Sequence, residues 1–105
     1  MANEIIKDER TIFEQIKEID EDGNEFWGAR KFSKVLDYGE FRSFVAVIER
    51  AIEACKNSGQ NVEEHFAAFT ESVPIGSGAE RWMESVKLSR YACYLIVQNA
   101  DSKKE

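Results

Sequence analysis

The sequence predicts a small α+β domain, mostly helical, with one short antiparallel β-hairpin and a helix-turn-helix-like pair of helices. Apolar residues recur at helical spacing in several segments, one later segment alternates with period two, and turn-forming residues separate these segments. The 105 residues, 43% of them hydrophobic, can bury one core but not a second self-sufficient domain. We therefore expect one domain over residues 11–105 after a frayed N-terminus at residues 1–10.

The net charge of −6 is unevenly distributed. Residues 1–25 hold nine acidic side chains against three basic ones, whereas the rest of the chain carries eleven of each. Acidity is therefore a property of the N-terminal segment, and the remaining surface can still present a basic face.

The composition also restricts compartment and redox chemistry. No stretch approaches the roughly 20 apolar residues of a membrane span, and the N-terminus lacks the apolar core of a signal peptide. We expect a cytoplasmic protein without a membrane partner. Cys55 and Cys93 lie inside apolar helical patterns at no metal-type or redox-type spacing, which predicts reduced thiols used as small hydrophobic side chains.

The first predicted element is a short amphipathic helix that leads into an acidic turn. Ile12, Ile16 and Ile19 recur at helical spacing in a charged segment, which favours a helix over a strand. Residues 20–24 are typical of a turn, and residues 25–27 follow as a short extended segment. Calcium is the alternative for this turn, but the third oxygen ligand and the closing glutamate of an EF-hand are missing, so we expect no metal site.

Two helices around a tight turn at Tyr38 and Gly39 are predicted next. Their apolar positions are Phe32, Val35 and Leu36 in the first helix and Phe41, Phe44, Val45, Ile48, Ile52 and Cys55 in the second. Residues 57–59 supply a helix stop. Asn61, with a glutamate three residues later, then resembles a capping box that begins a further helix through Phe66 and Phe69.

A two-stranded hairpin and a final helix complete the predicted fold. Residues 73–75 and 82–87 form the strands across a loop at residues 76–80, because residues 82–88 alternate with period two. Pro74 confines its strand to a sheet edge. Ser89 caps the last helix, whose apolar stripe consists of Leu88, Tyr91, Ala92, Leu95 and Ile96.

The residues make no positive case for an enzyme or a cofactor. His65, the single histidine, has no serine or cysteine partner in its local sequence, and a hydrolase would need either His65 or Cys93 to react. Residues 75–79 carry two glycines, which fit either a hairpin tip or an anion-binding loop. The lysine followed by serine or threonine of a Walker loop is absent, so a hairpin tip is favoured.

The helix pair at residues 29–57 is the stronger functional lead, because its plan is that of a helix-turn-helix. The expected exposed set of the second helix is Arg42, Ser43, Glu49, Arg50 and Glu53. Two acids in that set would repel phosphate, so the whole helix is a poor reader of the major groove. Candidate contacts to the DNA backbone are instead Arg30, Lys31, Lys34, Arg42 and, after the hairpin tip, Arg81. Two core helices with solvated charges remain the alternative.

Three separated blocks carry a resemblance to a known family. They are AIEACKNSGQNVEEHF at residues 51–66, IGSGAER at residues 75–81, and LSRYACYLIVQNADSKKE at residues 88–105. With FWGARKFSKVLDY at residues 26–38, they make residues 13–105 similar to the bacterial DNA-damage-inducible D (DinD) family. More distantly, the chain resembles the N-terminal domain shared by BRO proteins and phage antirepressors.

The resemblance implies a BRO-N-like, non-enzymatic domain of the bacterial SOS response that contacts DNA or modulates the RecA filament on single-stranded DNA. Family members continue beyond the last helix, so we expect the C-terminal region of the family to be absent here. Asp37 stands where the family commonly has glycine, Phe41 where it often has tryptophan, and residues 100–102 replace a usual Gly-Asp-Pro. The alternative function is a protein-interaction or dimerisation module without DNA affinity, and a homodimer is open in either case.

Overall fold

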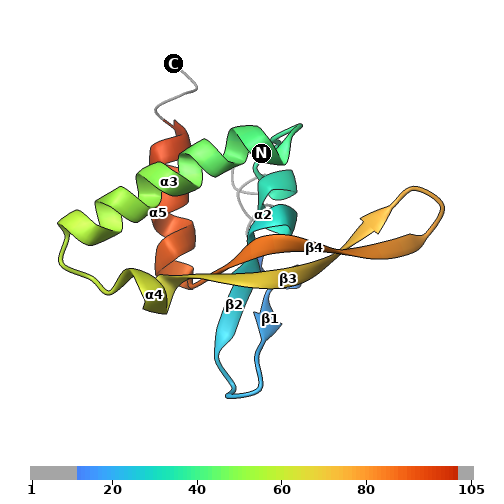
Figure 1. Cartoon of the computed structure of the whole chain (residues 1–105), viewed down its shortest axis with the longest axis horizontal. Helices are drawn as coiled ribbons and strands as arrows, with labels where there is room; N and C mark the ends of the chain where they lie inside the picture. The colour runs from blue at the N-terminus through green and yellow to red at the C-terminus, as the bar shows by residue number, and fades with distance from the viewer. Residues whose placement is uncertain (1–11, 102–105) are drawn as a thin grey trace, which may run out of the picture.

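The computed structural model describes residues 12–101, so the predicted fraying of residues 1–10 lies outside the described residues. After a helical turn at residues 12–15, the elements are β1 (Glu18–Ile19), β2 (Glu25–Gly28), α2 (Ala29–Val35), α3 (Phe41–Asn57), α4 (Val62–His65), β3 (Phe66–Ile75), β4 (Ala79–Leu88) and α5 (Arg90–Asp101). This arrangement confirms the α+β class (Figure 1). No helix within residues 12–101 is long and apolar enough to cross a membrane.

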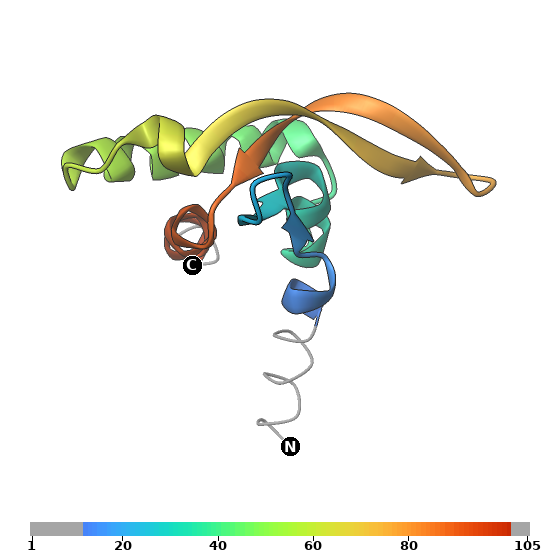
Figure 2. The same ribbon diagram turned by 90° about the horizontal axis from the view of Figure 1, so that it is seen from below.

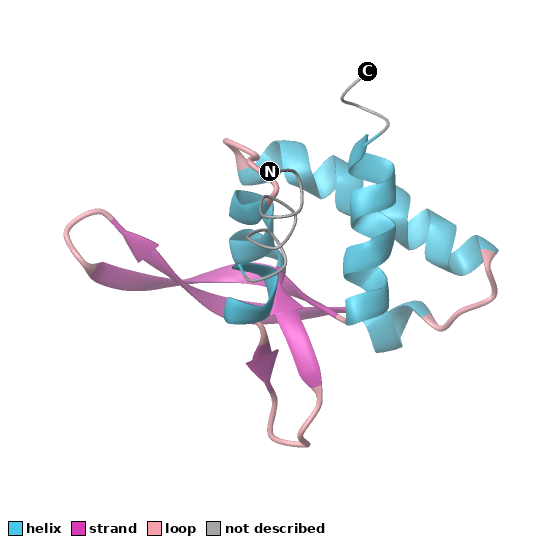
Figure 3. Ribbon diagram, turned by 180° about the vertical axis from the view of Figure 1, so that it is seen from behind, coloured by secondary structure: helices cyan, strands magenta, loops and turns pink. Residues whose placement is uncertain are grey.

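The strands form one antiparallel sheet in the order β1-β2-β4-β3. Helices α3 and α5 lie together to one side of the sheet, and the two hairpins project away from the helices in different directions (Figure 3). Strand β3 is an edge strand, so Pro74 lies at a sheet edge, as predicted. The predicted turn at residues 20–24 joins β1 to β2.

The core lies between the helices and the proximal part of the sheet. Helix α3 buries one face at helical spacing, and its buried residues are Phe44, Val47, Ile48, Ala51 and Cys55. Leu88, Ile96 and Trp27 are fully buried in the same hydrophobic cluster. The Trp27 Nε1–H donates to the Phe13 carbonyl oxygen at 2.8 Å, so this indole carries no unsatisfied donor into the core.

The prediction of a helix through Phe66 and Phe69 is wrong. Helix α4 begins at the predicted cap, where the Asn61 side chain accepts from Glu63 N–H at 3.0 Å, but it ends at His65. Residues 66–75 pair along their whole length with β4. Phe66 and Phe69 therefore lie on opposite faces of a strand: Phe66 is in the core, and Phe69 packs edge-on against Phe26 at 5.5 Å between ring centroids.

The predicted helix over Ile12, Ile16 and Ile19 is also wrong at its C-terminal end. Glu18 and Ile19 pair with β2 instead, and Ile19 remains 59% exposed. The reason is local: the Asp20 carboxylate accepts from the backbone N–H groups of Asp22 and Asn24, both at 2.9 Å, which closes the tight turn between β1 and β2.

A buried carboxylate joins the long hairpin to α2. Glu71, on β3, is only 2% exposed, and its oxygens accept from the backbone N–H groups of Arg30 at 3.0 Å and Lys31 at 3.1 Å. The Ser85 hydroxyl donates to it at 2.6 Å. Gly28, the residue before α2, has no side chain to cap the helix, so a carboxylate from another element supplies the cap. Its negative charge also interacts favourably with the positive end of the helix dipole.

Helices α2 and α3 end in the same way with different residues. Each ends in a Schellman motif: Tyr38 N–H donates to Ser33 O at 2.9 Å after α2, and Gln60 N–H donates to Cys55 O at 3.2 Å after α3. The left-handed position is Gly59 after α3, with φ 80°, but Asp37 after α2, with φ 68°. The loop between the two helices, residues 36–40, contains the predicted Tyr38 and Gly39, but its left-handed residue is Asp37, directly before them.

We predict that Gly28→Ala destabilises the domain by about 3 kcal/mol and lowers its Tm by at least about 10 °C, because a β-carbon there would overlap the buried Glu71 carboxylate. Thermal unfolding followed by circular dichroism measures this. Gly39→Ala is the matched control, since nothing lies within 4 Å of its added β-carbon. Equal Tm values for the two variants would contradict the role assigned to Gly28.

We predict that Asp37→Gly stabilises the domain by about 0.5 kcal/mol, because glycine relieves the left-handed backbone at φ 68°. Urea unfolding measures the change. Asp37→Ala removes the same carboxylate but keeps the β-carbon, so it separates backbone strain from charge. A gain of the same size in both variants would show that charge, not backbone conformation, sets the effect.

Candidate functional site

Arg30 lies where α2, α3 and β4 meet. Its Nε–H donates to the Glu84 carbonyl oxygen at 2.7 Å, and its guanidinium carbon lies 4.2 Å from the centroid of the Phe41 ring. A guanidinium stacked on an aromatic ring keeps its other N–H groups at the edge of the stack, where they can reach a further acceptor. Arg30 therefore has a structural task and also a free edge.

The other four predicted DNA-contact residues differ in their surroundings. Lys31 forms an ion pair with Glu18 at 3.5 Å, so β1 already supplies its counter-charge. Lys34, Arg42 and Arg81 are exposed and form no ion pair or side-chain hydrogen bond with any residue between 12 and 101. The structure thus separates Lys31 from the other three cations.

The remaining cations are distributed around the Arg30 junction. Lys34 lies one helical turn after Arg30 on the same face of α2, and Arg42 directly follows Phe41 in α3. Arg81 lies three residues from Glu84 toward the hairpin tip, about 10 Å along the strand. We call Arg30, Lys34, Arg42 and Arg81 the basic ridge. Exposed Glu40 lies beside it in the loop before α3 and reduces its local potential.

The predicted exposed face of α3 is confirmed. All five of its residues are exposed, namely Arg42, Ser43, Glu49, Arg50 and Glu53. The opposite face of α3 packs on α5 and the core. The acids on the exposed face still oppose insertion of the whole helix into a DNA groove.

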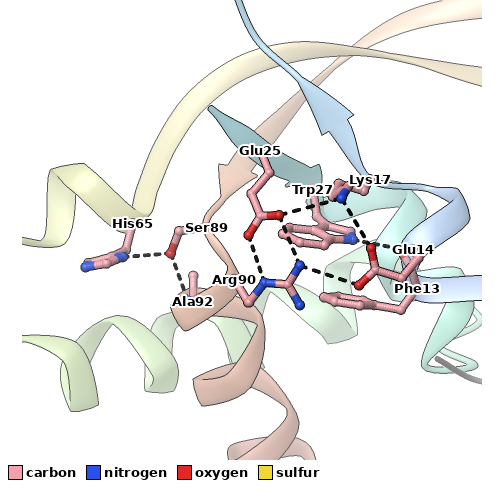
Figure 4. A network of polar contacts seen from close by, with 9 residues as sticks. All are labelled: Phe13, Glu14, Lys17, Glu25, Trp27, His65, Ser89, Arg90 and Ala92. Carbon is pink, nitrogen blue, oxygen red and sulfur yellow. Dashed lines mark hydrogen bonds and ion pairs between the residues drawn. The ribbon is translucent and has the colours of Figure 1, made fainter. Parts of the chain in front are cut away.

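A network around Arg90 joins the N-terminal part of the described chain to α5 (Figure 4). Arg90 donates to both oxygens of Glu25, at 2.8 and 3.0 Å, and its guanidinium lies 5.1 Å from the Trp27 ring. Glu14 and Lys17 complete the network through further ion pairs. The hydrogen bonds from Arg90 lower the pKa of Glu25, and the same bonds raise the pKa of Arg90.

A pair that local sequence does not reveal is formed by His65 and Ser89, 24 residues apart. Their Nδ1 and Oγ atoms are 2.7 Å apart, and Ser89 Oγ also accepts from Ala92 N–H at 3.0 Å, as an N-cap does (Figure 4). The Ser89 backbone N–H donates to the His65 carbonyl oxygen at 3.1 Å. Both residues thus belong to the joint between α4, β4 and α5. The hydrogen bond from Ala92 N–H to Ser89 Oγ confirms the cap predicted at Ser89.

This joint borders a hollow of about 490 Å³. Its basic side chains are already paired, Lys87 with Asp20 at 3.0 Å and Arg90 with Glu25 at 2.8 Å. Glu63 and Glu64 line the same hollow. The hollow therefore presents little uncompensated positive charge, and Ser89 in this pair acts as the N-cap of α5.

The cysteines are packing residues, as predicted. Cys55 and Cys93 are both buried and free. Burial raises the pKa of the Cys93 thiol well above its ordinary value, which disfavours the reactive thiolate. Between residues 12 and 101, no group of three or more histidine, cysteine or acidic side chains is placed to hold a metal ion.

Comparison with known proteins supports the resemblance predicted over residues 13–105. The model of the BRO family, N-terminal domain, matches residues 15–105. DNA damage-inducible protein D of Escherichia coli (strain K12) is 50% identical over 92 residues, which cover 88% of this chain and 34% of that protein. The chain thus spans about a third of the length of that relative. No solved structure matches it.

We predict that Glu25→Gln lowers stability at pH 7 by less than about 1 kcal/mol, because the pair with Arg90 is partly exposed. Since its pKa is lowered in the fold, Glu25 contributes stability above its ordinary pKa of 4.5 and loses it as pH falls through the lowered value. Urea unfolding at pH 7 and pH 3 measures this, with Glu49→Gln as control. A difference from wild type that persists undiminished at pH 3 would contradict it.

Proposed function

The chain belongs to the BRO family, in which it matches the N-terminal domain. From this membership we propose that it is a non-enzymatic DNA-damage response module. It contacts DNA, either directly or within a RecA–DNA filament, and modulates recombination. The relative from Escherichia coli is named a DNA damage-inducible protein, and its 50% identity over 92 residues supports a role of the same kind here.

The basic ridge is the observation that supports DNA contact. Three cations from three different elements, Lys34, Arg42 and Arg81, form no ion pair with any residue between 12 and 101. The Arg30 bonds to β4 and its stacking on α3 fix these elements relative to one another. Cations held on rigid elements lose little conformational entropy when they meet a phosphate backbone.

The ridge fits contacts to the DNA backbone better than base reading. Its members lie on a helix end, a helix start and a hairpin, so they fit a line of phosphates rather than one groove. Each phosphate contact with duplex DNA adds about −0.9 to the slope of log affinity against log salt. A ridge of three or four contacts therefore gives a slope of about −3 and binding that weakens strongly toward physiological salt.

We predict that Lys34→Glu with Arg42→Glu lowers affinity for labelled DNA at least about tenfold at low salt and makes the salt slope shallower by about 2. Fluorescence anisotropy with single-stranded and duplex oligonucleotides measures both quantities. Lys56→Glu is the matched control, because Lys56 is also exposed but lies in the last turn of α3. The proposal fails if the double variant binds like wild type, or if Lys56→Glu weakens binding equally.

A protein-interaction module without DNA affinity is the second candidate. The turn between β1 and β2 favours it, because Glu21 and Asp22 are exposed there without cationic partners in residues 12–101. This acidic tip would suit a basic protein surface. Absence of DNA binding even at low salt, together with binding to a preformed RecA filament, would establish this candidate instead.

A further inference from the structure

The β3–β4 hairpin extends beyond the body of the domain as an arm. Its distal half lies past α2, clear of the other described elements in both views, and ends in a short turn at residues 76–78 (Figures 1 and 2). Residues 74–82 are all exposed. An arm of this kind does not contribute to the core, so the side chains that it carries are available for contacts outside the domain.

The two faces of the arm have different surroundings. Arg81, Met83 and Ser85 alternate onto the face that also carries buried Glu71, which is turned toward α2. Glu80, Trp82 and Glu84 alternate onto the opposite face, which we call the outer face. Their partners on β3 are Pro74, Ser72 and Thr70.

Trp82 dominates the outer face. Its side chain is 70% exposed, whereas Trp27 is fully buried. Tryptophan is highly buried on average, and exposed tryptophans are enriched among residues that carry binding energy. An indole presented on an extended arm is therefore an anchor available to a partner.

The charges on the outer face select the partner. Glu80 and Glu84 lie two residues on either side of Trp82, and both are exposed. The Ser72 hydroxyl donates to Glu80, and the carboxylate of Glu84 has no partner between residues 12 and 101. Two carboxylates beside an indole repel phosphate and attract a cation, which can also stack on the ring.

The domain already builds this arrangement internally. Arg90 lies 5.1 Å from the Trp27 ring while it donates to the Glu25 carboxylate. The outer face offers the tryptophan and the carboxylates without the arginine. We propose that the outer face of the arm binds an arginine- or lysine-bearing segment of a partner protein, with the cation over Trp82 and paired with Glu84.

This surface is separate from the basic ridge and goes beyond the proposed function. Arg81 lies on the opposite face of the same strand, so the arm can present a cation to DNA on one side and an anionic aromatic surface to a protein on the other. A protein that is itself bound to DNA carries such cations, which gives the two surfaces compatible partners.

The probe is a short fluorescent peptide of alternating arginine and glycine, titrated against the domain at low salt and followed by anisotropy. We expect Trp82→Ala to weaken binding about tenfold, Trp82→Leu about fivefold, and Glu84→Gln about threefold. Glu53→Gln, which removes an exposed acid on α3, is the matched control. Equal affinity of wild type and Trp82→Ala would overturn the proposal, because the peptide would then follow net charge alone.

Acrylamide quenching gives a second readout, because buried Trp27 is shielded and Trp82 is not. Protection of Trp82 by the peptide supports the proposal. Protection by oligothymidine but not by the peptide would instead assign the indole to base stacking and overturn it. A dimer seen by sedimentation and dissociated by Trp82→Ala would assign the outer face to a second copy of the chain, which also overturns it.

The ridge variants separate this inference from the proposed function. Lys34→Glu with Arg42→Glu leaves the outer face intact, so the variant should bind the peptide at least as well as wild type. If the wild-type domain binds the peptide but no DNA, the proposal for the outer face stands and the proposal that the basic ridge contacts DNA fails. Lowered peptide affinity in this double variant would overturn the proposal, because the peptide would then contact the ridge region.

Discussion

The Glu71 carboxylate is the interaction on which the arrangement of the domain depends. It replaces the missing N-cap of α2 with a group from β3, and it does so in a buried site where hydrogen bonds from two backbone amides and a hydroxyl satisfy its oxygens. Gly28 is required because any side chain there would enter the space of the carboxylate. One ionisable group thus sets the position of α2, and through Arg30 also that of α3, relative to the long hairpin.

The sequence predicted those features that depend on residues close together in the chain. The α2–α3 pair, the turn at residues 20–24, the cap at Ser89 and the edge position of Pro74 all follow from residues near one another in the chain. The error at Phe66 and Phe69 came from non-local pairing. Phe66 and Phe69 stand three residues apart, as on one face of a helix. Pairing with β4 makes the segment a strand instead, so the two rings lie on opposite faces of the sheet and both pack against other residues.

The candidate site shows the same limit. The sequence identified the cations but not their partners, because Lys31 meets the Glu18 carboxylate only when β1 folds beside α2, and Arg30 donates to the backbone carbonyl oxygen of Glu84, 54 residues away. The buried role of Glu71 had no sequence signal, since a glutamate in an alternating strand is ordinarily taken as solvent-facing. The sequence did not predict the His65–Ser89 contact either, because the two residues are 24 positions apart; it predicted only that Ser89 caps a helix.

The connection between β4 and α5 has a mechanical consequence. Ser89 alone separates the last residue of the strand from the first residue of the helix, and its backbone and hydroxyl are bonded to α4 and to α5 at once. A ten-residue strand is roughly 30 Å long, and its middle is bonded to α2 through Ser85, Glu84 and the neighbouring Glu71, so the free distal half of the hairpin is a lever that pivots there. A lateral load on the tip is delivered first to α2, and the short connection at Ser89 leaves no flexible linker between β4 and α5 to absorb the rest.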